Sequence, residues 1–231
     1  IIPVKEFSDN EYLVMVTKNG IIKKTPASEY ESIRKSGKIA ITLKEGDELI
    51  SIFKTTGNDN IFLATRNGMA ICFNENDARA VGRTASGVKA IDLADGDYVV
   101  GAEPVREDSK VLLVTDGGYG KCTDLTSFRI QHRGGKGLKA YKITEKTGNI
   151  IGISMVNDSE ELIMVTSEGV VIRIRIKDIA TTTGRITQGV RLINLDDGVT
   201  VVSMDKISAE DAVEEESEEN NTEVTTETTE E

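Results

Sequence analysis

The hydrophobic positions of the chain follow a pattern that repeats about every 50 residues. In each repeat an apolar run ends at a Thr, and a Gly follows three residues after that Thr. The four runs and their glycines are Tyr12–Thr17 with Gly20, Ile61–Thr65 with Gly68, Val111–Thr115 with Gly118, and Leu162–Thr166 with Gly169. The runs are rich in Val, Ile and Thr, and Gly, Asn and Asp separate them. This pattern predicts short β-strands joined by tight turns.

A second glycine opens another apolar run in every repeat. These glycines are Gly37, Gly87, Gly137 and Gly189, spaced 50, 50 and 52 residues apart. The runs behind them read KIAITL, VKAIDL, LKAYKI and VRLINL, and after a further turn a fourth run begins, such as ELISIF. Four strand-like runs at this period are typical of propeller blades. Periodicity of 3.6 residues is absent, so segments such as 29–35 and 74–80 are expected to be loops or single helical turns.

We therefore predict an all-β, propeller-like fold built from four-stranded blades of about 50 residues. Residues 11–207 hold four repeats. Residues 1–10 resemble the fourth run of a preceding repeat, so we expect them to form the last strand of a truncated blade behind a cut end. From residue 208 the composition changes to Glu, Thr, Ser and Asn. Such a segment buries too little apolar surface to fold, so residues 208–231 are expected to be a disordered acidic tail.

The net charge is −11, from 28 basic and 39 acidic residues, and by itself it argues against nucleic acid as a partner. The charges are unevenly distributed, however. The last 24 residues contain 11 acidic residues and no basic one, which leaves 28 charges of each sign in residues 1–207. The position of the basic residues is therefore more informative than the sum.

Basic residues recur at fixed positions around the second glycine. Four residues before it stand Arg83, Arg133 and Arg185, and two residues after it stand Lys89, Lys139 and Arg191. In the first repeat the corresponding residues, Arg34 and Lys38, are one residue out of phase. On successive blades these side chains would lie at one height and form a curved basic track. Such a track suits duplex DNA, a regularly spaced polyanion, and bends it without reading its bases.

The third repeat has the densest basic loop. It reads Gln131-His132-Arg133-Gly134-Gly135-Lys136-Gly137, with Arg129 before it and Lys139 after it. Its glycines permit positive φ and a concave row of backbone N–H groups that would bind an anion. The spacing is not that of a phosphate-binding P-loop, so nucleotide hydrolysis is not expected here. His132 is either a pH-dependent DNA contact or a neutral loop residue.

Other classes of function have little support in the composition. No apolar run approaches the roughly 18 residues of a membrane-spanning helix. Two Cys and one His offer no zinc cluster, and so few Cys suggest the reducing cytoplasm. Cys72 and Cys122 occupy equivalent places in neighbouring repeats and are expected to be buried as small hydrophobic residues. No Tyr lies in a sequence cluster of Arg and carboxylates, so neither a catalytic residue nor a metal site is expected.

The loop QHRGGKG resembles the Gln-basic-Arg-Gly-Gly-basic-Gly box of the C-terminal domains of DNA gyrase A subunits, with His132 at its second position. The stretches GRTASGVKAIDL, RGGKGLKAYKI and GRITQGVRLINL are similar to the blade loops and strands of that family, and the resemblance covers residues 1–207. It implies a β-pinwheel, a propeller-like disc whose blades exchange strands with their neighbours. The box that defines the family lies in its first blade, whereas the box here looks like the related copy in a later blade.

The resemblance also implies a function. In this family the domain binds, bends and wraps duplex DNA without sequence specificity, which gives an ATP-dependent type II topoisomerase its negative-supercoiling ability. The implied partners are duplex DNA, a gyrase B subunit and a second gyrase A subunit in an A2B2 enzyme of the bacterial cytoplasm, associated with the nucleoid. Mg²⁺ and ATP are used elsewhere in that enzyme, and the DNA-cleaving Tyr lies in the N-terminal part of the gyrase A subunit. No cofactor or catalytic residue is therefore expected in this chain.

The residues expected to contact DNA are those of the phased basic positions and the glycine-rich loop. They are Arg34, Lys38, Arg83, Lys89, Arg129, Gln131, His132, Arg133, Gly134, Gly135, Lys136, Gly137, Lys139, Arg185 and Arg191. Two alternatives stay open. The A-type subunit of topoisomerase IV has a similar domain with degenerate boxes, and a propeller scaffold for protein partners would lack a continuous basic rim. The tail suggests a further hypothesis, in which residues 208–231 fold back on the basic track and compete with DNA.

Overall fold

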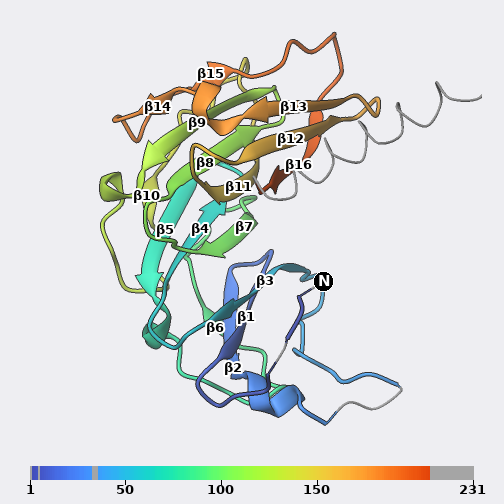
Figure 1. Cartoon of the computed structure of the whole chain (residues 1–231), viewed down its shortest axis with the longest axis vertical. Coiled ribbons are helices and arrows are strands. Elements are labelled where there is room, and N and C mark those ends of the chain that lie inside the picture. Colours follow the sequence, from blue (N-terminus) through green and yellow to red (C-terminus); the bar gives the residue numbers. More distant parts are fainter. Residues whose placement is uncertain (1, 5, 33–35, 209–231) are drawn as a thin grey trace, which may run out of the picture.

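The computed structural model describes residues 2–4, 6–32 and 36–208, which form strands and short 3-10 turns (Figure 1). The longer strands are β1 (Tyr12–Thr17), β2 (Ile21–Pro26), β3 (Leu49–Thr55), β4 (Asn60–Thr65), β5 (Met69–Asn74), β7 (Val99–Pro104), β8 (Lys110–Thr115), β9 (Tyr119–Asp124), β11 (Ile150–Val156), β12 (Glu161–Thr166), β13 (Val171–Arg175) and β16 (Val201–Ile207). The two-residue strands are β6 (Val88–Lys89), β10 (Leu138–Lys139), β14 (Thr181–Thr182) and β15 (Val190–Arg191). The 3-10 turns are η1 (Ala27–Tyr30), η2 (Glu75–Asp77), η3 (Leu125–Ser127) and η4 (Ile176–Asp178).

The recurring Thr and Gly make the turn of the central hairpin in every repeat. In the first hairpin, the Thr17 hydroxyl oxygen accepts the Ile21 N–H at 3.2 Å, and Gly20 has a φ of +77°. The same hydroxyl contact recurs at 3.2, 3.2 and 3.1 Å in the next three hairpins, from Met69, Tyr119 and Val170 to their Thr partners. Gly tolerates positive φ without steric cost. The sequence pattern thus specifies a local turn, and the turn sets the register of β1 with β2 and its equivalents.

The strands form four small sheets that are antiparallel except for the pairing of β14 with β9; the first lies at the bottom of Figure 1 and the last two lie at its top. Their orders are β3-β1-β2-β6, β10-β5-β4-β7, β11-β8-β9 with β14 and β15 beyond, and β13-β12-β16. The outer strands β6, β10 and β15 come from the repeat that follows the sheet they join. The all-β, propeller-like fold with exchange of strands between neighbouring blades is therefore confirmed.

Three details differ from the prediction. In the last three repeats the third run contributes only two residues to a sheet, and in the first repeat the run at residues 38–43 forms no strand. The last sheet has three strands among the described residues, where four were expected. Residues 2–4 and 6–10 form no strand either. An extended segment becomes a strand only when a neighbour pairs with it, and Ile2 instead lines a cavity beside β3 and β7.

The innermost strands β3, β7, β11 and β16 contact one another in chain order. Apolar side chains fill the space between successive sheets in three clusters, centred on residues such as Ile61, Phe62 and Leu112. Cys72 and Cys122 are free and buried, as predicted, and burial raises the pKa of each thiol to about 11. No helix in the described part of the chain is long and apolar enough to cross a membrane.

A buried ion pair joins the first two blades. The Nζ atom of Lys24 on β2 lies 2.9 Å from Oε2 of Glu75 on η2, and both side chains are almost fully buried. The Glu75 carboxylate also accepts the backbone N–H groups of Gly57 and Asp59 and the Thr55 hydroxyl, at 2.8 to 2.9 Å. These bonds satisfy the buried charge, since an unpaired carboxylate in the core would cost several kcal/mol.

Candidate nucleic-acid interface

The basic residues lie on four rim loops, defined here as residues 36–43, 78–92, 128–142 and 180–194. Consecutive rim loops are joined by backbone hydrogen bonds at equivalent positions. The donor and acceptor pairs are Thr42 N to Ala85 O at 3.4 Å, Asp92 N to Gly135 O at 2.9 Å, and Lys142 N to Thr187 O at 3.0 Å. The four loops therefore form one connected band.

The phased arginines connect the loops a second time. Arg83 donates through Nη1 to the carbonyl of Ile39 at 2.9 Å, and Arg133 donates through Nη1 to the carbonyl of Lys89 at 2.9 Å. Arg185 repeats the contact through Nε to the carbonyl of Lys139 at 2.8 Å. Each acceptor lies two residues after the second glycine of the preceding repeat. The arginines thus fasten each loop to its neighbour, and only their remaining N–H groups are left for a phosphate.

Two buried lysines support the rim loops from below. The Lys121 ammonium group donates to the carbonyls of Gly184 at 3.4 Å and Arg185 at 2.6 Å, and its side chain is fully buried. Lys23 occupies the equivalent position in the first blade and donates to the carbonyls of Ala40 and Arg83. Burial, together with the nearby charge of Arg83 or Arg185, lowers the pKa of the two ammonium groups to about 8.

The sequence interpretation missed these lysines, although the signal was present. Lys23 and Lys121 stand three residues after the first glycine, inside otherwise buried strands, where the other two repeats have Ile71 and Ile172. A Lys in such a run indicates a buried charge that needs partners. Asp77 was missed as well, and it receives both the backbone N–H of Arg133 and, through its carbonyl, the Nε of that residue.

The cations that point to solvent are a different set from the arginine fasteners. Arg129, Lys136 and Lys139 are exposed, and Lys89 is exposed with its Nζ 2.8 Å from Oδ1 of Asp92. That hydrogen bond, together with the charge of Lys89, lowers the pKa of the Asp92 carboxyl. Arg79 and Lys142 are exposed as well, so six exposed cations come from the second and third rim loops.

The fourth loop presents a cation together with a tyrosine. Arg191 donates through Nε and Nη2 to the Tyr119 hydroxyl at 3.1 and 3.0 Å, and through Nη1 to Asn194 at 2.9 Å. The Arg191 hydrogen bonds, followed by a hydrogen bond from Lys146, lower the pKa of Tyr119. Arg191 is thus exposed and held in one orientation. In the first loop, Lys38 donates to the carbonyl of Glu29 at 3.5 Å.

The glycine-rich loop is not the open row of N–H donors that its sequence predicts. The N–H of Gln131 donates to Cys72, and that of Gly134 donates to Ala90, so these donors bind backbone oxygens of the protein. Gly137 has a φ of +75°, and a Cβ there would lie 2.4 Å from a backbone oxygen of β5. Glycine is needed at position 137 because β10, which follows it, pairs with β5 at this close distance. Gly135 and His132 are exposed, with His132 Nδ1 3.2 Å from Asp77 Oδ2.

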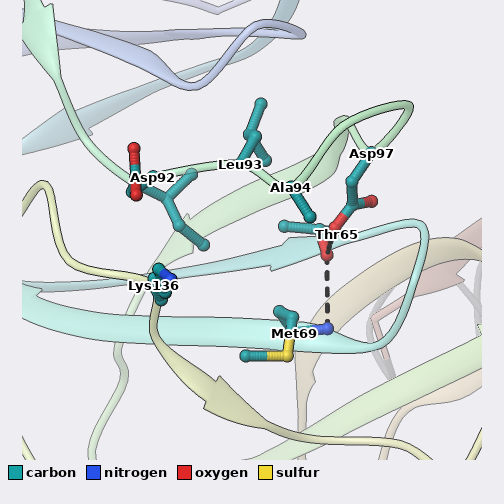
Figure 2. Close-up of a pocket in the computed structure, with 8 residues that line it drawn as sticks. Thr65, Met69, Asp92, Leu93, Ala94, Asp97 and Lys136 are labelled. Carbon is teal, nitrogen blue, oxygen red and sulfur yellow. Dashed lines mark hydrogen bonds between the residues drawn. The ribbon is translucent and has the colours of Figure 1, made fainter.

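A cavity of about 290 Å³ lies beside this loop, between the second and third rim loops. Figure 2 shows Lys136 and Asp92 at one end of the cavity and Asp97 at the other. The hydrogen bond drawn in Figure 2 is the turn contact from the Met69 N–H to the Thr65 hydroxyl. Leu93 and Ala94 form the apolar wall of the cavity. The cavity places Lys136 over mixed polar and apolar surface. Asp97 lines it from the turn before β7, where its carboxylate accepts the Thr65 hydroxyl at 2.7 Å.

Some predicted features lie outside the described residues. Arg34 is among them, and so is the tail from residue 209 onward. Within the described ranges no group of three or more His, Cys, Asp or Glu side chains is placed to hold a metal ion. The structure therefore brings together the predicted positions of the second, third and fourth loops, but it gives the arginines and glycines of those loops mainly structural contacts.

The repeats match a known family. The family described as "DNA gyrase C-terminal domain, beta-propeller" matches residues 11–56, 59–106, 109–157 and 160–208. The DNA gyrase A subunit of Halalkalibacterium halodurans is 56% identical over 211 residues, which are 91% of this chain and 25% of that protein. The gyrase A subunit of Clostridium acetobutylicum is 49% identical over 212 residues, which are 92% of this chain and 25% of that protein. The chain thus spans about a quarter of the length of these relatives.

Two solved structures have the same fold. The C-terminal domain of DNA topoisomerase IV superposes with a TM-score of 0.86 at 29% identity, covering 96% of this chain and 69% of that chain. The DNA gyrase A C-terminal domain superposes with a TM-score of 0.79 at 26% identity, covering 88% and 68%. The matched segments follow the four hairpin repeats described above, with β1, β4, β8 and β12 at their starts. The chain belongs to the family of DNA gyrase C-terminal domains with a β-propeller fold.

Proposed function

We propose that this chain binds, bends and wraps duplex DNA along its rim loops, without sequence specificity. The observation that carries the proposal is the connected band of rim loops with exposed cations at repeated positions. Phosphates recur regularly along DNA, so evenly placed cations on a curved support favour a bent path. Base-edge contacts are not required, as in other proteins that bind through the backbone and its deformability.

The two kinds of basic residue have separate roles in this mechanism. Arg83, Arg133 and Arg185 hold the loops in register, because each fastens its loop to the preceding one. Lys89 and Lys139 stand beside those fasteners with exposed side chains, and the Lys89 ammonium group also pairs with Asp92. Ammonium groups on flexible stems suit a sequence-tolerant contact with phosphates, because they act as point charges without a fixed geometry.

The family and the relatives' names support a wider proposal. As part of a gyrase A subunit, the chain would act in an A2B2 enzyme in the bacterial cytoplasm, at the nucleoid. Wrapping would there give ATP-dependent strand passage its bias toward negative supercoils, with ATP, Mg²⁺ and the cleaving Tyr on other parts of the enzyme. The sequence identities of about half to gyrase A subunits favour gyrase over topoisomerase IV, whose domain has the same fold.

The test is a DNA-binding titration by fluorescence anisotropy at several salt concentrations. The rim loops carry seven exposed cations, which predict a slope of log affinity against log salt of about −6. They are Arg79, Lys89, Arg129, Lys136, Lys139, Lys142 and Arg191. Replacing Lys89 and Lys139 with Ala should reduce that slope by about 2. Lys54→Ala is the matched control, since Lys54 lies on β3 and pairs with Glu11. Absent or salt-independent binding would refute the proposal.

Wrapping is tested separately from binding by a topology-shift assay. Circular DNA with a single nick is sealed by a ligase in the presence of the chain, and the linking number is then read on a gel. The triple change of Arg83, Arg133 and Arg185 to Ala should reduce the shift more than it reduces affinity, because the loops lose their fixed spacing. A shift that persists unchanged would mean that the arginine contacts do not organise the DNA path.

A further inference from the structure

The cavity of about 290 Å³ beside the glycine-rich loop lies between two neighbouring blades that are both present in the chain. Its apolar wall comes from Met69 on β5 and from Ile91, Leu93 and Ala94, which follow β6. Lys136 of the third rim loop lies at one end of the cavity (Figure 2). The cavity thus combines an apolar wall with one basic side chain at its edge.

The other polar side chains that line the cavity already have partners in the protein. The Asp97 carboxylate accepts the Thr65 hydroxyl at 2.7 Å and two backbone N–H groups at 2.9 and 3.0 Å. The Asp92 carboxylate pairs with Lys89 at 2.8 Å. Lys136 is exposed and makes no hydrogen bond or ion pair within the described ranges. Among the residues that line the cavity, Lys136 therefore carries the charge that is still available to a ligand.

The corresponding space between the third and fourth rim loops is filled by a side chain of the protein itself. Tyr141 stands four residues after its second glycine, as Ile91 does, and its ring is fully buried. The Tyr141 hydroxyl donates to the carbonyl of Gln188, which occupies the position of Lys136, one residue before the next second glycine. One blade thus closes this space with an aromatic ring that ends in a polar group. The preceding blade leaves it open, because Ile91 is shorter than Tyr.

We propose that the cavity binds a small aromatic acid, whose ring takes the place that Tyr141 fills in the next blade and whose carboxylate pairs with Lys136. The apolar wall supplies contact area for the ring, and the ammonium group fixes the orientation through a charge-assisted hydrogen bond. A second carboxylate on the ligand would find no free cation in the cavity lining, so a monoanion fits best. A cavity of this size suits a bicyclic ring rather than a drug-sized molecule.

A bound acid would also remove Lys136 from the cations available to DNA. This consequence rests on the proposed function, in which exposed cations of the rim loops pair with phosphates. Each such pair contributes about 0.9 to the dependence of log affinity on log salt. A saturated cavity should therefore reduce the slope by about 1. The site would couple DNA binding to the concentration of aromatic acids.

The test is a titration of the whole chain with sodium 2-naphthoate, without DNA, followed in methyl NMR spectra of its Ile, Leu and Met residues. The signals of Met69, Ile91 and Leu93 should shift along one saturating curve, whereas that of Met204 on β16 should stay in place. 2-Naphthalenemethanol has the ring system without the charge, and it should bind about threefold to tenfold more weakly. Acetate has the charge without the rings and should not shift these methyl signals.

Two variants separate this site from other apolar surfaces. Ile91→Tyr should fill the cavity as Tyr141 does and abolish the shifts. Lys136→Met should weaken 2-naphthoate binding by about threefold to tenfold and leave 2-naphthalenemethanol binding unchanged. Lys142→Met is the matched control, since Lys142 is exposed on the same rim loop but does not line the cavity. Shifts spread over unrelated methyl groups overturn the proposal, as does equal affinity of the parent and Lys136→Met for 2-naphthoate.

Competition with DNA is measured separately by fluorescence anisotropy. The salt titration is run with 2-naphthoate at saturation, and with the same concentration of acetate as the ionic control. The slope of the parent chain should fall by about 1, and that of Lys136→Met should not change. An unchanged parent slope with a saturated cavity overturns the competition. A chain that binds the acid but no DNA refutes the proposed function and leaves the cavity site in place.

Discussion

Replacing Lys121 with Met is expected to remove a pH-dependent contribution to the stability of the third blade. Burial, aided by the charge of Arg185, lowers the pKa of this ammonium group from 10.5 to about 8 in the folded protein. Below pH 8 both the folded and the unfolded chain hold the proton. Between pH 8 and 10.5 the unfolded chain holds more protons, so the contribution of Lys121 to the free energy of unfolding rises with pH.

The two pKa values set the size of the effect. Their difference corresponds to about 3 kcal/mol when the whole interval is crossed, and to about 2 kcal/mol between pH 7 and about pH 9.5. Met retains most of the packing of the stem, but it leaves the carbonyls of Gly184 and Arg185 without this donor, at a cost of about 1–3 kcal/mol. That second term does not vary with pH. The change in stability difference across the pH range therefore isolates the buried charge.

The assay is urea unfolding followed by far-UV circular dichroism, on the parent chain and on Lys121→Met, at several pH values. The parent should gain about 2 kcal/mol relative to the variant as the pH rises from 7 to about 9.5. Lys54→Met is the control, since it removes the same charge from a side chain on β3 that is 33% exposed. Parallel stability curves for the parent and Lys121→Met would show that the ammonium group is not held in a desolvated site.

Three further outcomes are expected. Lys24→Met should lower the free energy of unfolding by about 3–5 kcal/mol, because Glu75 keeps its buried charge without the cation. A loss of less than about 1 kcal/mol, measured by thermal unfolding, would contradict this. Gly137→Ala should destabilise the chain far more than Gly37→Ala, since only the first places a Cβ against a backbone oxygen, and urea midpoints of equal size would oppose it. If the acidic tail competes with DNA, deleting residues 208–231 should tighten DNA binding at low salt in band-shift titrations, whereas unchanged or weaker binding would count against competition.

Much of the fold follows from the sequence because its turns are local. Thr17 and Gly20 specify a hairpin within four residues, and the same pair in every repeat predicts the strand order inside a blade. Pairing between blades depends on residues far apart in the chain. The two-residue length of β6 and the unpaired state of residues 38–43 are therefore not visible in an alternating pattern. The exchange of strands was expected only from the resemblance to a known family.

The candidate site shows a similar limit. Phasing of basic residues predicts that they share one position on successive blades, but it does not separate a side chain that faces solvent from one that binds protein. Arg133 and Lys139 are equally basic and equally regular in the sequence. Only the structure shows that the first donates to the carbonyl of Lys89, because backbone acceptors carry no sequence signal. The buried Lys121 escaped notice for the opposite reason, since one polar residue in an apolar run changes the pattern little.

The exchange of outer strands also affects how such an array changes in evolution. Each of these sheets takes its outermost strand from the next sequence repeat, since β6 pairs with β2 and β10 pairs with β5. The boundaries of a sheet and of a sequence repeat therefore differ by one strand. A tandem duplication of one whole repeat therefore adds a strand donor and an acceptor edge in a single event. The new copy inherits interfaces that already fit its neighbours, whereas a duplication of any other length leaves one of them unmatched. The number of blades is consequently easy to change by unequal recombination, while the length of each repeat is held near 50 residues.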